Sequence, residues 1–119
     1  MKKKYDINIT QQVAETIALE IVDDAGNSRD VSSYLFKMDC RQHPNSESAY
    51  FTIGSDDSTI FIDSSQNNKL WLVFKHELTK TLNFDKGAYD LIAYSPDKIH
   101  VEILMSGTVN LQKSYTKLN

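Results

Sequence analysis

The sequence of 119 residues contains one cysteine and four glycines. Because Cys40 is alone, an intramolecular disulfide is impossible, and the paired Cys-x-x-Cys motifs of redox and zinc sites are absent. This cysteine usage favours synthesis in a reducing compartment. We expect Cys40 to be a small buried hydrophobe, since free cysteine is among the most buried residue types. The four glycines stand far apart, so no glycine-rich phosphate-binding loop is present.

Long apolar runs and an excess of basic charge are also missing. No segment approaches the roughly 18 apolar residues that a membrane-spanning helix needs. Residues 1–4 (MKKK) are basic, but no apolar run follows them, so we expect no signal peptide. The formal net charge is −3, which gives no electrostatic footprint for nucleic acid. We therefore expect neither a nucleic acid nor a membrane as a partner.

The chain is of a length typical of one domain, and its apolar residues alternate with polar ones in many short stretches. This period of two predicts strands at residues 5–9, 14–22, 34–41, 49–53, 59–62, 69–75, 88–94, 99–105 and 108–111. Turn residues such as DDAGN at 23–27 separate them, with Gly26 or Asn27 able to adopt a positive φ. A short helical turn is predicted near residues 77–82. The pattern indicates a single antiparallel β-sandwich of about eight strands over residues 1–112, with a C-terminal tail at 113–119.

Two predicted strands have informative faces. In residues 34–41 the side chains of Tyr34, Phe36, Met38 and Cys40 share one face, which we expect to be buried. Residues 69–75 are apolar at nearly every position. Either both faces of that strand are covered, or one of them meets a partner.

Residues with chemical potential are present but scattered. His43, His76 and His100 each stand alone, without a second ligand at metal spacing, and we expect surface histidines. Asp56, Asp57 and Asp63 lack calcium-loop spacing, as does the segment at 23–27, so turn roles are expected for both. Serine is frequent, but GxSxG is absent, and Ser106-Gly107 has no base near it in sequence. We therefore name no catalytic, cofactor-binding or metal-binding residue and expect no cofactor.

Aromatic residues offer one alternative. Trp71 and Tyr94 would be the leading members of a sugar-stacking platform if they shared an exposed face. Aromatics in alternating strands more often pack in a core.

The first half of the chain carries a recognisable order of short motifs. YDINITQ occupies residues 5–11, DDAGN follows at 23–27, DVSSY at 30–34, and MDCR at 38–41. The second half continues with LWLVF at 70–74, TKTL at 79–82, GAYDL at 87–91 and GTVNL at 107–111. In this order the chain resembles small immunoglobulin-like proteins encoded among the structural genes of tailed bacteriophages. The resemblance covers nearly the whole chain.

Three departures from that family pattern are visible. Gln12 stands where many relatives have glycine, the Y-x-Y-D-L element is shortened to YDL at 89–91, and SPDK at 95–98 replaces a glycine-containing turn.

The resemblance implies an immunoglobulin-like fold and a non-enzymatic role in the virion. A bacterial host cytoplasm would be the place of synthesis. The expected location in the particle is the tail, baseplate or fibre-attachment region, with the head surface as another possibility. The implied partners are other virion proteins and further copies of the chain, bound through the 86–112 hairpin or an edge strand.

Other readings remain beside this one. The main alternative is a carbohydrate-binding module for host attachment; weaker ones are a bacterial accessory or inhibitor protein and, last, an enzyme. If Asp90 points inward it needs hydrogen-bond partners, and Asp90→Ala would then destabilise the fold.

Overall fold

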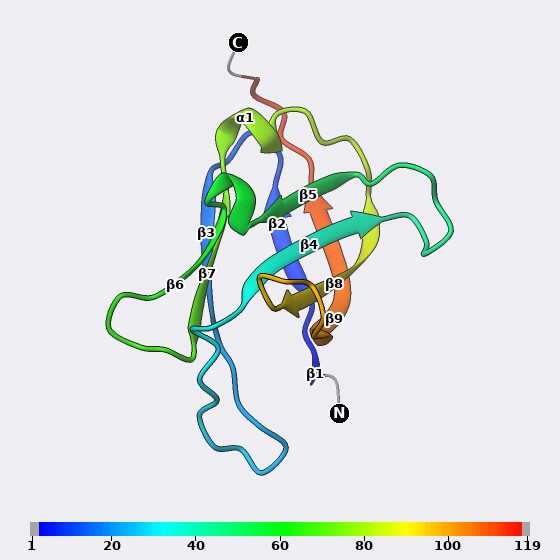
Figure 1. Cartoon of the computed structure of the whole chain (residues 1–119). Coiled ribbons are helices and arrows are strands. Elements are labelled where there is room, and N and C mark those ends of the chain that lie inside the picture. Colours follow the sequence, from blue (N-terminus) through cyan, green and yellow to red (C-terminus); the bar gives the residue numbers. More distant parts are fainter. Residues whose placement is uncertain (1–2, 118–119) are drawn as a thin grey trace.

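The computed structural model describes residues 3–117, and nearly all of its regular structure is β-strand (Figure 1). The strands are β1 (Lys3–Lys4), β2 (Ile7–Thr10), β3 (Glu15–Glu20), β4 (Leu35–Arg41), β5 (Phe51–Gly54), β6 (Ile60–Ile62), β7 (Lys69–Phe74), β8 (Lys86–Tyr94) and β9 (Val101–Gln112). A 3-10 turn, η1 (Ser55–Asp57), and a one-turn helix, α1 (His76–Thr79), lie between strands. The helical turn predicted near residues 77–82 is present, but it begins one residue earlier and ends at Thr79.

The strands form two sheets with an immunoglobulin-like order. One sheet runs β1-β9-β8-β4-β5, with β2 also paired to β9, and the other runs β3-β7-β6. In an immunoglobulin sandwich strands B, E and D share one sheet, C, F and G share the other, and C′ extends the second sheet beside C. Strands β3, β7 and β6 occupy the B, E and D positions, and β4, β8, β9 and β5 occupy C, F, G and C′. The predicted all-β sandwich is confirmed.

The N-terminal strands add a parallel edge to this arrangement. Both β1 and β2 pair with β9 in parallel, with Ile7 opposite Val109 and Ile9 opposite Leu111. All remaining pairs among the described strands are antiparallel, as expected. Because β2 pairs with the last strand and not with a neighbour in sequence, no tight turn forces it to run antiparallel. The pairing covers an edge of β9 that would otherwise expose unpaired backbone groups.

The last strand is longer than the sequence suggested. Two strands were predicted, at 99–105 and 108–111, with a break at Ser106-Gly107, and this prediction is wrong because β9 continues through both residues. Gly107 marks a close approach between backbones and not a break: a Cβ at this position would lie 2.2 Å from the carbonyl oxygen of Tyr5.

The core lies between the two sheets and is built from alternate residues of each strand. On β4 the predicted inward face is confirmed, since Phe36, Met38 and Cys40 are buried and Tyr34 packs against the core. Burial raises the pKa of the Cys40 thiol to about 12, so this thiol is protonated and unreactive at neutral pH. The opposing sheet contributes a row of buried residues: Leu19, Ile60, Leu70, Leu72 and Phe74.

The two faces of the apolar strand β7 have different surroundings. Leu70, Leu72 and Phe74 are buried in the core, whereas Trp71 and Val73 point outward and are half-buried. One face of β7 is therefore covered by the partner sheet, and the other is apolar but partly open to solvent.

The described part of the C-terminal tail contacts the body of the domain. The Lys113 ammonium lies 3.2 Å from the Asp85 carboxylate, and the Ser114 amide donates to Oε1 of Gln11 at 3.2 Å. Gln11 is buried and donates its side-chain amide to the Leu82 carbonyl at 2.7 Å. Residues 118–119 lie outside the described part of the chain.

Candidate functional site

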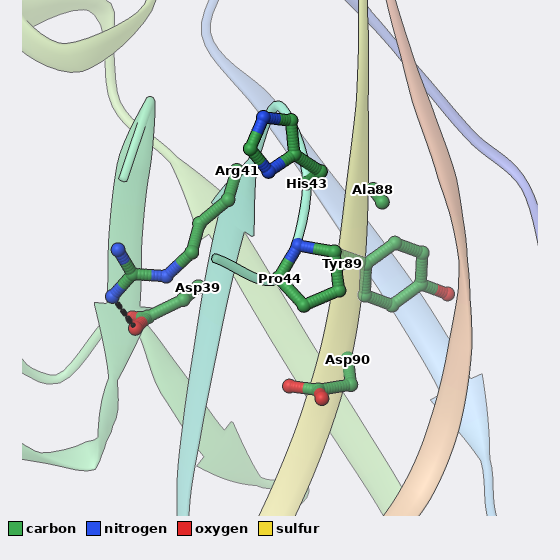
Figure 2. A pocket seen from close by; sticks show the side chains of 7 residues that line it. All are labelled: Asp39, Arg41, His43, Pro44, Ala88, Tyr89 and Asp90. Atoms are coloured by element: carbon green, nitrogen blue, oxygen red, sulfur yellow. Dashed lines mark hydrogen bonds and ion pairs between the residues drawn. The ribbon is translucent and has the colours of Figure 1, made fainter. Parts of the chain in front are cut away.

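A shallow hollow lies on the outer face of the six-stranded sheet, where β4 and β8 run beside the loop at 42–50 (Figure 2). Its volume is about 230 Å³, and it is lined by Asp39, Arg41, His43, Pro44, Ala88, Tyr89 and Asp90. Figure 2 shows Tyr89 and Asp90 pointing to opposite sides of β8. The hollow is smaller than the 300–1,000 Å³ typical of small-molecule sites.

Two carboxylates face each other across this hollow, because Asp39 on β4 pairs with Asp90 on β8. Thr52 donates its hydroxyl to Asp39 at 2.7 Å, and Arg41 donates to the same carboxylate at 2.9 Å. Burial raises the pKa of the Asp39 carboxyl, but these two hydrogen bonds and the positive charges of Lys37 and Arg41 together outweigh that effect, so its pKa lies below its ordinary value. Arg41 also donates to the Ser46 carbonyl at 3.1 Å, which holds the loop against the sheet.

Asp90 is the unneutralised member of this pair. It is exposed on the outer face, and among residues 3–117 no hydrogen bond or ion pair reaches its carboxylate. The hypothesis that Asp90 points inward and is held by backbone amides is therefore wrong: Tyr89 and Leu91, its neighbours on β8, are the inward residues. The hollow therefore contains the exposed carboxylate of Asp90 beside Arg41, whose guanidinium already donates to Asp39 and to the Ser46 carbonyl.

The three histidines lie in three separate elements, and two of them are exposed, as predicted for surface histidines, whereas His76 is half-buried. His43 is exposed in the loop at 42–50, and His100 is exposed in the β8–β9 turn. His76 begins α1, and its Nε2 lies 3.3 Å from Oε1 of Gln12. Within residues 3–117 no group of three or more His, Cys, Asp or Glu side chains is placed to hold a metal ion. No helix in that part of the chain has the length and apolar character required to span a membrane.

Asp23 and Asp57 act in turns, as predicted. Asp23 accepts hydrogen bonds from the amides of Ala25 and Asn27, both at 2.9 Å, and Gly26 adopts φ 86°. Asp57 accepts a hydrogen bond from the Thr59 hydroxyl. These contacts close their local turns.

Asp63 has a further role, because Nε1 of Trp71 donates to its carboxylate at 2.8 Å. The Ser65 hydroxyl and amide donate to it as well, at 2.8 and 3.0 Å. The Trp71 hydrogen bond, followed by those from Ser65, lowers the pKa of Asp63 to about 2.

The two aromatics proposed for a sugar platform do not share a face. Trp71 lies on the outer face of the three-stranded sheet, and Tyr94 lies on the outer face of the six-stranded sheet, on the opposite side of the sandwich. The prediction that these two residues form a sugar-stacking platform is therefore wrong. Instead Phe61 stands directly opposite Trp71 on β6 and is 44% exposed. The ammonium of Lys69 lies 4.7 Å from the centroid of the Trp71 ring.

A second apolar surface lies on the outer face of the six-stranded sheet, at its β8–β9 hairpin end. The strand register places Leu35, Tyr94 and Val101 in one row, and the exposed Lys37, Ile92 and Ile103 in the next. The five apolar residues of these two rows are called the hairpin face below. Val101 is 57% exposed, and Ile99 beside it in the turn is 75% exposed.

Sequence reasoning named the 86–112 hairpin as a possible binding surface but did not identify which of its faces is open. On β8 the residues of both faces are apolar near the turn, so alternation gave no sign of which side was open. The signal that could have found it is the run LIAY at 91–94 in a hairpin, because a strand of an antiparallel sheet usually shows polar residues on its open side.

Comparison of the sequence with protein-family models and with curated proteins gave no match.

Proposed function

We propose that the chain is a non-enzymatic structural protein of a tailed-bacteriophage particle. It belongs to the tail, baseplate or fibre-attachment region of the virion and works by binding other virion proteins and further copies of itself. It is made in the cytoplasm of the bacterial host. The proposal rests on the order of the motifs along the chain, and the fold gives that order a physical meaning.

The observation that carries the proposal is the meeting of three motif segments at Gly107. The first segment (5–11) pairs with the last (107–111) along β2 and β9. The third, GAYDL at 87–91, places Tyr89 opposite Gly107, and the Tyr89 hydroxyl donates to the Tyr5 carbonyl at 2.6 Å. Without a side chain at Gly107, the Tyr5 backbone can lie against β9 with the Tyr89 ring beside it. Residues about one hundred positions apart thus contact one another and depend on each other's size at this point. Such dependence is expected if these motifs define one fold family.

One departure from the family pattern has a structural counterpart. Gln12 has φ 74°, in the left-handed region that glycine adopts without strain. A glycine at this position in relatives would suit the same turn between β2 and β3. The substitution therefore leaves the resemblance intact.

The surfaces of the domain suit an assembly role. Apolar side chains lie open on the outer faces of both sheets, and β5 and β6 are short edge strands. Exposed apolar patches and free strand edges are features through which proteins bind one another.

Quantitative peptide mass spectrometry of density-gradient-purified phage particles that carry this gene tests the proposal. We expect the chain at a fixed copy number that is a multiple of the rotational symmetry of one particle substructure. Absence of the chain from purified particles would contradict the proposal and favour an assembly factor or a host-directed binding protein.

A second candidate function is carbohydrate binding on the outer face of the three-stranded sheet. The Phe61–Trp71 pair on that face favours it. Two neighbouring aromatic rings beside a carboxylate and an ammonium group offer both stacking and hydrogen bonding to a sugar. Because Trp71 is the only tryptophan, its fluorescence reports on this site directly. Saturable quenching or a spectral shift on titration with cell-wall sugars, lost in Phe61→Ala, would support this function; an unchanged spectrum would exclude these sugars as ligands.

A further inference from the structure

We infer that the hairpin face is a self-association surface, on which two copies of the chain pack around a two-fold axis that lies in the interface and crosses the strands. The inference deepens the proposed assembly function and rests on it for its biological setting. It names the surface, the occupant and the relative direction of the strands.

The apolar part of this surface is created by a β-bulge. The register of β8 and β9 shifts between Leu91 and Ile92, so that Leu91 pairs with Met105 and Ile92 pairs with Ile103. The extra residue, Leu104, packs against the core, and Met105 is buried. The bulge thereby sets Ile103 beside Ile92 on the outer face.

A charged pair lies behind this surface, on the core-facing side of β9, where Glu102 stands opposite the buried Ala93. Arg29 makes a two-pronged contact with Glu102, at 2.5 and 2.9 Å, beside Ile103. The hydrogen bond from Arg29 lowers the pKa of the Glu102 carboxyl. Both charges of this pair are satisfied within one copy, so they need no partner across an interface.

Unpaired charges of opposite sign lie at the two ends of the hairpin face, and a further charge, that of Lys37, lies at its β4 side in the row of Ile92 and Ile103. Asp90 lies three residues before Ala93 on β8, about 10 Å along the strand at 3.3 Å per residue. Lys98 lies at the hairpin tip, where its amide donates to the Ser95 carbonyl at 2.8 Å. Lys98 is exposed, and among the described residues no hydrogen bond or ion pair reaches its ammonium group. The Ser95 amide donates to the His100 carbonyl at 2.8 Å, so the tip begins at Pro96, three residues and about 10 Å beyond Ala93 at 3.3 Å per residue.

This charge pattern selects the second copy as the occupant and sets its direction. A two-fold axis across the strands at the level of Ala93 reverses the strand direction of the partner. It lays the two rows of the hairpin face on those of the other copy, with Lys37 of each copy against Leu35 of the other, and brings Lys98 of each copy toward Asp90 of the other. A two-fold contact requires such self-complementarity, with each residue pair occurring twice. An interface with an apolar centre and charged ends is the usual anatomy of a protein–protein contact.

Sedimentation equilibrium of the purified full-length chain at micromolar concentrations tests this arrangement. We expect a reversible dimer in the wild type. Val101→Glu should weaken it at least about tenfold, because it places a charge in the apolar centre. Phe61→Glu, the same change at an exposed apolar position on the opposite sheet, should leave the dimer constant unchanged. Circular dichroism and thermal melting confirm that each variant is folded.

A charge exchange tests the direction of the strands. Asp90→Lys and Lys98→Glu should each weaken the dimer, by about tenfold at low salt, whereas the double variant should recover most of the loss. A wild type that stays monomeric would overturn the inference. So would Val101→Glu dimerising like the wild type, or a double variant weaker than either single one.

These results separate the inference from the proposed function. A chain that is monomeric in solution but present in purified particles contradicts the dimer and leaves the virion role standing. A chain that dimerises through this face but is absent from particles contradicts the virion role.

Discussion

The two outer faces of the sandwich both carry exposed apolar side chains, but they differ in the contacts that neighbouring polar and charged side chains make. On the three-stranded sheet, Trp71 donates to Asp63, and Lys69 lies over its ring. On the six-stranded sheet, the apolar residues of the hairpin face lie beside the exposed Lys37, and the side-chain charges beyond its two ends, Asp90 and Lys98, form no hydrogen bond or ion pair within the described residues. Apolar exposure alone therefore does not distinguish the two faces. The difference is that the aromatic residues of one face are bound to neighbours within the monomer, whereas the other face is the one that we propose binds a second copy.

Removing the Trp71 side chain should have the largest effect on stability. We expect Trp71→Ala to lower the free energy of unfolding by about 2 kcal/mol, since it removes a half-buried ring and leaves Asp63 without its indole donor. Phe61→Ala, beside it but more exposed, should cost less than about 1 kcal/mol. Urea unfolding followed by circular dichroism measures both changes. Equal losses would show that Trp71 is no better integrated into the monomer than Phe61.

The Asp63 contact should also appear in the pH dependence of stability. The folded pKa of Asp63 is about 2, below its ordinary value of 3.8, so the ionised form stabilises the fold. That contribution is fully present above about pH 4 and is lost as the pH falls toward about 2. Asp63→Asn lacks it, so the difference in melting temperature between wild type and variant should shrink across this window. A difference that stays constant from pH 5 to pH 2 would contradict this role.

The smallest effect is expected at Asp90. Because its carboxylate is exposed and unpaired, Asp90→Ala should change the free energy of unfolding by no more than about 0.5 kcal/mol. The same substitution should weaken self-association, because it removes one end of the charge pattern on the outer face. Thermal melting at low protein concentration isolates the first effect. A large loss of stability there would mean that Asp90 has a structural role within the monomer.

The sequence predicted the fold better than it predicted the surfaces. The alternation in β4 identifies Phe36, Met38 and Cys40 as core residues because polar side chains occupy the other face. In β8 and β9 this contrast is missing, so the open face could not be recognised. The bulge that sets Ile103 beside Ile92 depends on pairing between the strands and has no local signature.

Relations across the sandwich were equally hidden. Trp71 and Tyr94 lie in strands of similar composition, and only the sheet order places them on opposite faces. At Ser106-Gly107 the sequence suggested a break, because a glycine within a strand marks either an interruption or a close approach of another backbone. The approaching backbone is that of Tyr5, about one hundred residues away, and local reasoning could not supply it.

The most direct test of the account is incorporation into particles. Phages that encode the wild type, Val101→Glu or Phe61→Glu would be purified on a gradient, and the copy number of the chain measured by quantitative peptide mass spectrometry. The account predicts equal, fixed copy numbers for wild type and Phe61→Glu, and a loss of about tenfold or more for Val101→Glu. Incorporation of Val101→Glu at the wild-type level would contradict the claim that the chain assembles through its hairpin face.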